Sequence, residues 1–325
     1  MLSDHLHNLK TQSLSLREFE HLSRMLVLGE RFSHAAEAKA IIPKKIAPRL
    51  TSARQLSTPT IPRVIHQTFE TSQVTQSMYD AAMRWVEINP EFEYRFYDKD
   101  DRRDFIRKHF GGDMLSAYDK INHGAFKADF WRYCILYQHG GVYADIDILT
   151  LAPLRQVIHA GDQFVAAREP IVRYGITNSF ICVPSKHPFM KAAIERATQK
   201  IHENSGKFDG FMLTGPANLG MAVNACLGRA ENTEQNLGVS FDGTAHSYRL
   251  VELLSPLPNR PRCMVDNGRV ILQSEYPGYR KELSVFGLKH WLMDPVYSGF
   301  VPRLRRSLVG RVVRRYVRKF IPKTP

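Results

Sequence analysis

Two carboxylates stand two residues apart near the middle of the chain. Asp145 and Asp147 follow a double glycine and the short apolar run Val142–Ala144. We expect this run to be a strand, and side chains at positions i and i+2 of a strand point to the same side. Two carboxylates aimed at one point repel each other unless a cation lies between them. Mg²⁺ or Mn²⁺ meets that need, although an isolated Asp-x-Asp is more often a solvated strand end.

The segment before the two carboxylates has the pattern of a helix. Its residues from about Lys127 to Gln138 carry apolar side chains at spacings of three and four, and Gly140 is placed to stop the helix. Asp129 and Arg132 are three apart and therefore share one helix face. They form either an ordinary ion pair on the helix or a surface that binds a ligand.

These residues resemble a known family. The stretch Lys127–Asp147 resembles the signature of the sugar-binding DxD glycosyltransferases, which include the fungal initiating α-1,6-mannosyltransferases and inositolphosphoceramide mannosyltransferases. The glucosylating clostridial toxins share the same core. Ile61–Phe69 resembles the family's opening strand, with Phe69 where a tryptophan is usual. Three further segments are similar to core segments of the family: Trp85–Asp98, Asn178–Pro188 and Thr214–Pro216.

The resemblance implies a GT-A-like nucleotide-sugar-binding fold of the α/β class, with a mainly parallel central sheet flanked by helices. It also implies roles for particular residues, each with a plainer alternative in the core or in a turn. The expected catalytic residues are Asp145, Asp147 and Arg132. The expected ligands of Mn²⁺ or Mg²⁺ are Asp145, Asp147 and His290. The expected substrate-binding residues are His66, Gln67, Phe69, Asp129 and Asn178.

The expected reaction is transfer of a hexose from a nucleotide-sugar, either UDP-hexose or GDP-mannose, to a glycan or lipid-linked acceptor. The resemblance implies retention of the anomeric configuration, and surface polysaccharide or glycolipid synthesis is the expected setting. The alternative is a nucleotide-sugar-binding protein without turnover. A metal-dependent phosphohydrolase also uses Asp-x-Asp, but it would need a nucleophilic aspartate after an early apolar strand, and none stands there.

Strand-like and helix-like patterns alternate along the chain, which indicates an α/β sandwich. Ligands bind beyond the carboxyl ends of strands in such sheets, where Asp145 and Asp147 lie. The expected strands are Arg63–Gln67, Tyr94–Tyr97, Val142–Ala144, Phe164–Ala167, Ser179–Val183 and Val270–Leu272. The expected helices are Met78–Ile88, Asp100–His109, Lys127–Tyr137, Phe189–Glu203 and Asn218–Leu227. We expect a helical extension and linker over 1–58, a glycosyltransferase domain over 59–300 and a separate helix over 301–325.

Composition fits one globular enzyme domain with appendages: 325 residues, of which 43% are hydrophobic and 24% charged. Four scattered cysteines form no metal-binding pair, so we expect them to be reduced and mostly buried. Neither a signal peptide nor an apolar run of about 20 residues is visible in the sequence. We therefore expect a cytoplasmic enzyme.

The C-terminal segment 301–325 holds nine arginines and lysines and no acid. The rest of the chain has a net charge of +4, against +13 for the whole. Apolar residues recur in the segment at helical spacing, which predicts a basic amphipathic helix lying on an anionic membrane surface. Simple packing on the parent domain is the alternative. Nucleic acid is not an expected partner, because the apolar face is extensive and no nucleic-acid motif appears elsewhere.

Overall fold

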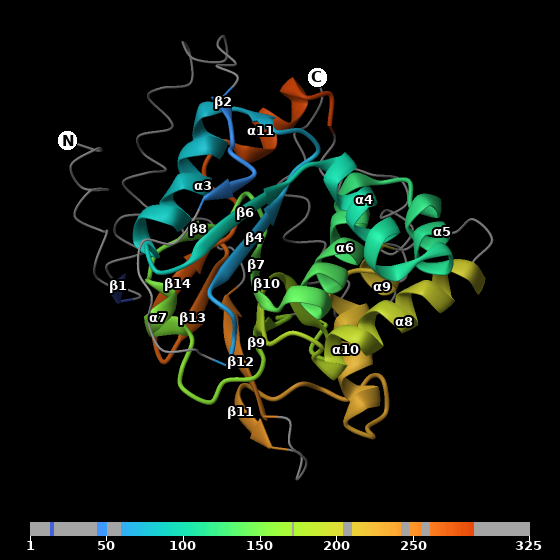
Figure 1. The fold of residues 1–325 in the computed structure, drawn as a ribbon. Helices are drawn as coiled ribbons and strands as arrows, with labels where there is room; N and C mark the ends of the chain where they lie inside the picture. Colours follow the sequence, from blue (N-terminus) through green and yellow to red (C-terminus); the bar gives the residue numbers. More distant parts are fainter. Residues whose placement is uncertain are drawn as a thin grey trace, which may run out of the picture.

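The computed structural model describes residues 14–15, 44–50, 60–170, 172–203, 210–241, 247–254 and 261–288. Its core is a twelve-stranded mixed sheet with helices on both faces (Figure 1). Five of the six central strands run in the same direction, and only β10 is reversed. In spatial order these strands are β12 (Ser247–Leu254), β9 (Val165–Arg168), β10 (Ile176–Val183), β7 (Gly141–Ala144), β4 (Val64–Thr68) and β6 (Glu93–Tyr97). The expected α/β fold with a mostly parallel central sheet flanked by helices is confirmed.

Shorter strands extend the sheet, and all of them pair antiparallel. Beyond β12 lie β13 (Cys263–Asp266), β14 (Arg269–Gln273), β8 (Leu149–Thr150), β11 (Gly238–Phe241) and β1 (Leu14–Ser15). Beyond β6 lies β3 (Arg49–Leu50), while β2 (Lys44–Lys45) and β5 (Gln73–Val74) form a separate pair. The described parts of the predicted N-terminal extension are therefore short strands joined to the core. Its boundary, and that predicted at residue 300, stay predictions.

The helices divide between two apolar clusters, one on each face of the sheet. One face is covered by α4 (Lys99–Phe110), α5 (Gly112–Lys120), α6 (Gly124–His139), α8 (Pro188–Glu203), α9 (Gly210–Leu213) and α10 (Pro216–Cys226), on the right of Figure 1. The other face is covered by α3 (Gln76–Ile88), α7 (Leu154–Val157) and α11 (Tyr279–Val285). The predicted helices and strands are all present, with ends that differ by at most three residues. The cysteines are free and three of them are buried, as expected.

The turn from α6 into β7 places the two carboxylates. The His123 imidazole caps the start of α6 by accepting from the Ala125 amide at 3.2 Å. Gly140 and Gly141 then adopt positive φ angles of 64° and 96°. A Cβ on Gly140 would overlap the Ser185 backbone, and one on Gly141 would overlap the Val64 carbonyl. The double glycine thus permits a tight entry into the sheet that other residues would obstruct.

No helix among the described residues is long and apolar enough to cross a membrane. The predicted C-terminal helix over 301–325 and His290 lie outside those residues.

Candidate active site

The site lies where β4 and β7 end side by side. The two strands are parallel and His66 pairs with Tyr143, so Thr68 comes level with Asp145. The backbone of Asp145 is fixed from both sides: its amide donates to the Ser179 carbonyl at 2.8 Å, and its carbonyl accepts from the side-chain Nε2 of Gln67 at 3.1 Å. Because β10 and β4 hold this residue, its position is set by the sheet itself.

The two carboxylates do not share a strand. β7 ends at Ala144, and Asp147 lies in a turn in which the Ile148 amide donates to the Asp145 carbonyl at 3.1 Å. The expectation that both side chains project from one strand was therefore wrong in its geometry. The two remain electrostatic neighbours: burial raises the pKa of Asp147 well above its ordinary value, and the charges of Asp145 and Glu275 raise it further.

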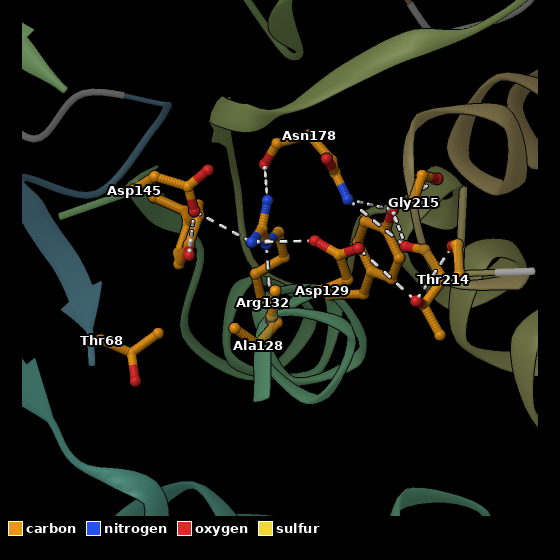
Figure 2. Close-up of polar contacts among 12 residues, drawn as sticks. Thr68, Ala128, Asp129, Arg132, Asp145, Asn178, Thr214 and Gly215 are labelled. Carbon is orange, nitrogen blue, oxygen red and sulfur yellow. Dashed lines mark hydrogen bonds and ion pairs between the residues drawn. The ribbon is translucent and has the colours of Figure 1, made fainter. Parts of the chain in front are cut away.

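Arg132 joins the helix to the strand end. Its Nη2 lies 2.9 Å from Oδ1 of Asp145 and 2.9 Å from Oδ1 of Asp129, so the guanidinium lies between the two carboxylates (Figure 2). Its Nη1 donates to the Asn178 carbonyl at 2.7 Å. Burial opposes the charge of Arg132, but the Asp145, Tyr143 and Asp129 side chains outweigh that effect and raise the pKa of the guanidinium. Arg132 is 3% exposed, which suits a residue that holds the site together.

Tyr143 contributes two contacts that the sequence did not reveal. Its hydroxyl donates to Oδ1 of Asp145 at 2.6 Å, and its ring lies under the Arg132 guanidinium at 4.4 Å. A cation over an aromatic face is stabilised by the ring quadrupole. Tyr143 therefore fixes the carboxylate and the cation together. It is the second residue before Asp145 in a strand, and the same-side rule of strands could have identified it.

Asp129 lies at the inner end of this chain of contacts. Its carboxylate receives Arg132 at 2.9 Å and faces the Thr214 hydroxyl at 3.5 Å (Figure 2). Nearby, the side-chain Nδ2 of Asn178 donates to the Tyr133 hydroxyl at 3.0 Å. Burial raises the pKa of Asp129 to about 7, although the charge of Arg132 acts in the opposite direction. The structure thus brings Asp129, Asn178, Arg132 and Asp145 into one connected network, of which the spacing in the sequence indicated only the Asp129–Arg132 pair.

The donor set suits a hard divalent cation. Asp145 and Asp147 offer carboxylate oxygens, the ligand type that Mg²⁺ and Mn²⁺ prefer. Burial first, and then the neighbouring charges of Asp145 and Glu275, raise the pKa of Asp147, and a bound cation would oppose both effects. Across the described residues, no group of three or more His, Cys, Asp or Glu side chains is arranged to enclose a metal. Beyond these two carboxylates, substrate phosphates and water are the ligands that Mg²⁺ usually takes, and the predicted ligand His290 lies outside the described residues.

Comparison with known proteins bears on the same residues. Residues 75–165 match the glycosyltransferase sugar-binding region containing the DXD motif. In this chain the motif is Asp145-Ile146-Asp147. The resemblance drawn from the sequence is confirmed.

Curated relatives carry the same region. The chain is 30% identical to inositol phosphoceramide mannosyltransferase 3 of Schizosaccharomyces pombe over 130 residues, which is 40% of this chain and 35% of the relative. It is 34% identical to an uncharacterised glycosyltransferase of Acanthamoeba polyphaga mimivirus over 39% of this chain and 52% of the relative. The chain thus spans about half or less of the length of these relatives. Among solved structures, the PaToxG glycosyltransferase is similar at 15% identity and a TM-score of 0.43, covering 63% of this chain and 79% of that one.

Of the other predicted substrate-binding residues, Gln67 binds the Asp145 carbonyl, whereas His66 and Phe69 make their described contacts elsewhere. His66 is fully buried and contacts the Gly140 carbonyl at 3.1 Å, at the opposite end of β7 from Asp145. Burial and the neighbouring Arg95 lower its pKa to about 3, which keeps it neutral. Phe69 is 6% exposed and packs edge-on against Phe286 at 5.1 Å. This geometry favours a core role for His66, and the predicted roles of His66, Phe69 and His290 stay predictions.

A segment that the sequence analysis missed also reaches the turn formed by residues 145–148, which we call the DXD turn. The Tyr276 amide donates to the Asp147 carbonyl at 3.0 Å, and Glu275 adjoins it with a left-handed φ of 57°. Tyr279 follows on α11, and burial, then Asp147 and Asp145, raise the pKa of its phenol. The signal was available, because Val270–Leu272 was expected to be a strand and the residues after a strand end belong to the ligand-binding edge.

Proposed function

We propose that this protein is a metal-dependent glycosyltransferase that moves a hexose from a nucleotide-sugar to a glycan or lipid-linked acceptor. The observation that carries the proposal is the contact chain Asp129–Arg132–Asp145, which ends beside Asp147 at the carboxyl edge of the sheet. It lies inside the region that matches the DXD family. A buried network that presents two carboxylates at such an edge suits a metal-bound diphosphate better than it suits a structural role.

The chain's own residues would act by position and charge. Arg132 and Tyr143 hold the Asp145 carboxylate at a fixed point, and the sheet holds its backbone. Asp129, which retains 13% exposure, offers an oxygen for a hydroxyl of the donor sugar. Preorganised groups of this kind stabilise charge that develops in the transition state without having to reorient. The incoming acceptor hydroxyl would pass its proton to the departing phosphate.

Asp145 and Asp147 would hold Mn²⁺ or Mg²⁺, with His290 as a further ligand. When bound, the cation supplies positive charge against the leaving diphosphate. UDP-hexose and GDP-mannose are the donor classes that the proposal covers. The mannosyltransferase name of the fungal relative favours a mannosyl donor and a glycolipid acceptor.

One assay tests the proposal directly. The protein is incubated with Mn²⁺ and a panel of nucleotide-sugars, and released nucleoside diphosphate is measured with and without excess chelator. We expect release from at least one donor, at least a hundredfold reduced by chelator and by Asp145→Asn or Asp147→Asn. Asp104→Asn, which removes a 63% exposed carboxylate on α4, is the matched control. Unchanged release in the Asp145/Asp147 double variant would refute the assignment.

The stereochemical part of the proposal has its own measurement. Retention predicts that the transferred sugar keeps the anomeric configuration of the donor, which proton NMR of the early product reports. An inverted product would contradict retention while leaving the glycosyltransferase assignment in place. Binding of a nucleotide-sugar with no release or transfer would instead favour the non-catalytic alternative.

A further inference from the structure

The DXD turn is surrounded by carboxylates, whose negative charge would repel the phosphates of a donor diphosphate. Asp129, Asp145, Asp147 and Glu275 all bear on it electrostatically. Arg132 is poorly placed to meet the incoming charge, because it is 3% exposed and its nitrogens already bind Asp145, Asp129 and two backbone carbonyls. A cationic side chain that binds the donor phosphates, in addition to the metal proposed at Asp145 and Asp147, must therefore come from another part of the edge.

The ladder between β8 and β14 brings such a partner close. Gln273 pairs with Leu149, so two residues further along, Glu275 comes level with Asp147. The hydrogen bond from the Tyr276 amide to the Asp147 carbonyl, at 3.0 Å, shows that the two segments stay together past the strand ends. Glu275 and Tyr276 are consequently neighbours of the DXD turn.

Arg280 is held at this place by a two-point ion pair. Its Nε and Nη2 each donate to a carboxylate oxygen of Glu275 at 2.7 Å. The Arg280 side chain is 39% exposed and that of Glu275 is 32% exposed, so solvent and ligands reach both. Arg102, a cation near the end of β4, differs in being 1% exposed and bound to Glu70 and Thr68.

We propose that Arg280 binds the diphosphate of the donor, exchanging the Glu275 carboxylate for phosphate oxygens. The planar guanidinium donates in parallel to phosphate as it does to carboxylate. The exchange costs little, because an exposed ion pair contributes about 1 kcal/mol or less. The inference rests on the proposed function, since it assumes a nucleoside diphosphate donor at this edge.

The test compares nucleotides that differ by one phosphate. Affinities for GDP and GMP, and for UDP and UMP, are measured by calorimetry in excess Mn²⁺. We expect the wild-type protein to prefer a diphosphate, and Arg280→Gln to weaken diphosphate binding about tenfold while leaving monophosphate binding unchanged. Glu275→Gln breaks the same ion pair but keeps the cation, so it should retain the diphosphate preference.

A matched control comes from α4, where exposed Arg103 makes an equivalent two-point pair with Asp119 at 2.8 and 2.7 Å. Arg103→Gln should change neither affinity. A diphosphate preference that survives Arg280→Gln overturns the inference, as does an equal loss in Glu275→Gln, which would mean that the pair only shapes the loop. Absence of nucleotide binding by the wild-type protein would refute the proposed function and the inference with it.

Discussion

The Arg132 guanidinium links helix α6 to the DXD turn. A lysine at this position cannot make the same contacts. Lys keeps one positive charge but loses the fork that reaches Asp145, Asp129 and the Asn178 carbonyl together. We expect Arg132→Lys to lower kcat/KM about a hundredfold and stability by only about 1–3 kcal/mol. Donor turnover and urea unfolding measure the two effects. A loss of activity that merely follows a loss of cooperative folding would favour a plain ion pair.

Removing the Tyr143 hydroxyl tests a single contact of the site. Tyr143→Phe removes the 2.6 Å hydrogen bond to Asp145 but keeps the ring under Arg132. We expect about a tenfold loss of kcat/KM with a stability change of about 1 kcal/mol. The matched control is Tyr248→Phe on β12, which removes a buried hydroxyl that accepts from Arg229 at 2.9 Å. Equal losses in the two variants would count against a specific role for Tyr143.

Asp129 should make stability depend on pH. Its folded pKa of about 7 lies above the ordinary 3.8, so between these values the folded protein binds a proton that the unfolded chain does not. The contribution of this group to stability is therefore favourable at low pH and is lost as pH rises through about 7. We expect the stability of the wild-type protein relative to Asp129→Asn to fall between pH 4 and 8, by about 4 kcal/mol at most. Chemical denaturation of both proteins at each pH measures this, and parallel pH profiles would refute it.

At the scale of elements, the α6–β7 turn depends on two kinds of constraint at once. In Gly140→Ala the new Cβ would overlap the Ser185 backbone, and the residue would also have to keep a positive φ. In Gly161→Ala the φ is positive too, but no atom lies near the new Cβ. We expect the Gly140 variant to lose several kcal/mol and the Gly161 variant about 1 kcal/mol. Urea unfolding compares them, and similar losses would show that close packing at Gly140 matters little.

The elements that the sequence predicted are those with strong local periodicity. Helix α6 and strand β7 were predictable because Gly140, apolar spacing and β-branched or aromatic residues all favour the same structure. The pairing of Asn178 with Arg132 was not predictable in detail, because it depends on β10 running against its neighbours. The loop around Glu275 follows a predicted strand, but its place beside Asp147 depends on the pairing of β14 with β8, some 120 residues earlier in the chain. The turn at Asp147 could not be predicted either, because the sequence Asp-Ile-Asp is equally compatible with a strand.

For the whole molecule, the remaining proposal concerns location. We propose that residues 301–325 bind an anionic membrane surface and keep the enzyme at the cytoplasmic face of the plasma membrane. Nine bases and no acid support this, at about 1 kcal/mol for each base that engages the surface. Deleting residues 302–325 should release the protein from anionic vesicles and leave hydrolysis of a soluble donor intact.

Flotation of full-length and truncated protein with vesicles of phosphatidylglycerol and phosphatidylcholine measures this. Neutral vesicles are the control for charge. Equal flotation of both proteins, or of neither, would refute the membrane role. Loss of cooperative unfolding on truncation would show instead that the segment packs on the core.

The reversed strand β10 has one more consequence. The strand begins at the edge where its neighbours end, so its Asn178 and Ser179 carbonyls bind Arg132 and the Asp145 amide. The Asp145 amide thus continues the hydrogen bonding between β7 and β10 by one residue beyond the end of β7. In hydrogen–deuterium exchange it should open only with the sheet, on the slow timescale of global unfolding. The reactive edge would then be among the last parts of the molecule to loosen, and rapid exchange at Asp145 in a folded protein would contradict this.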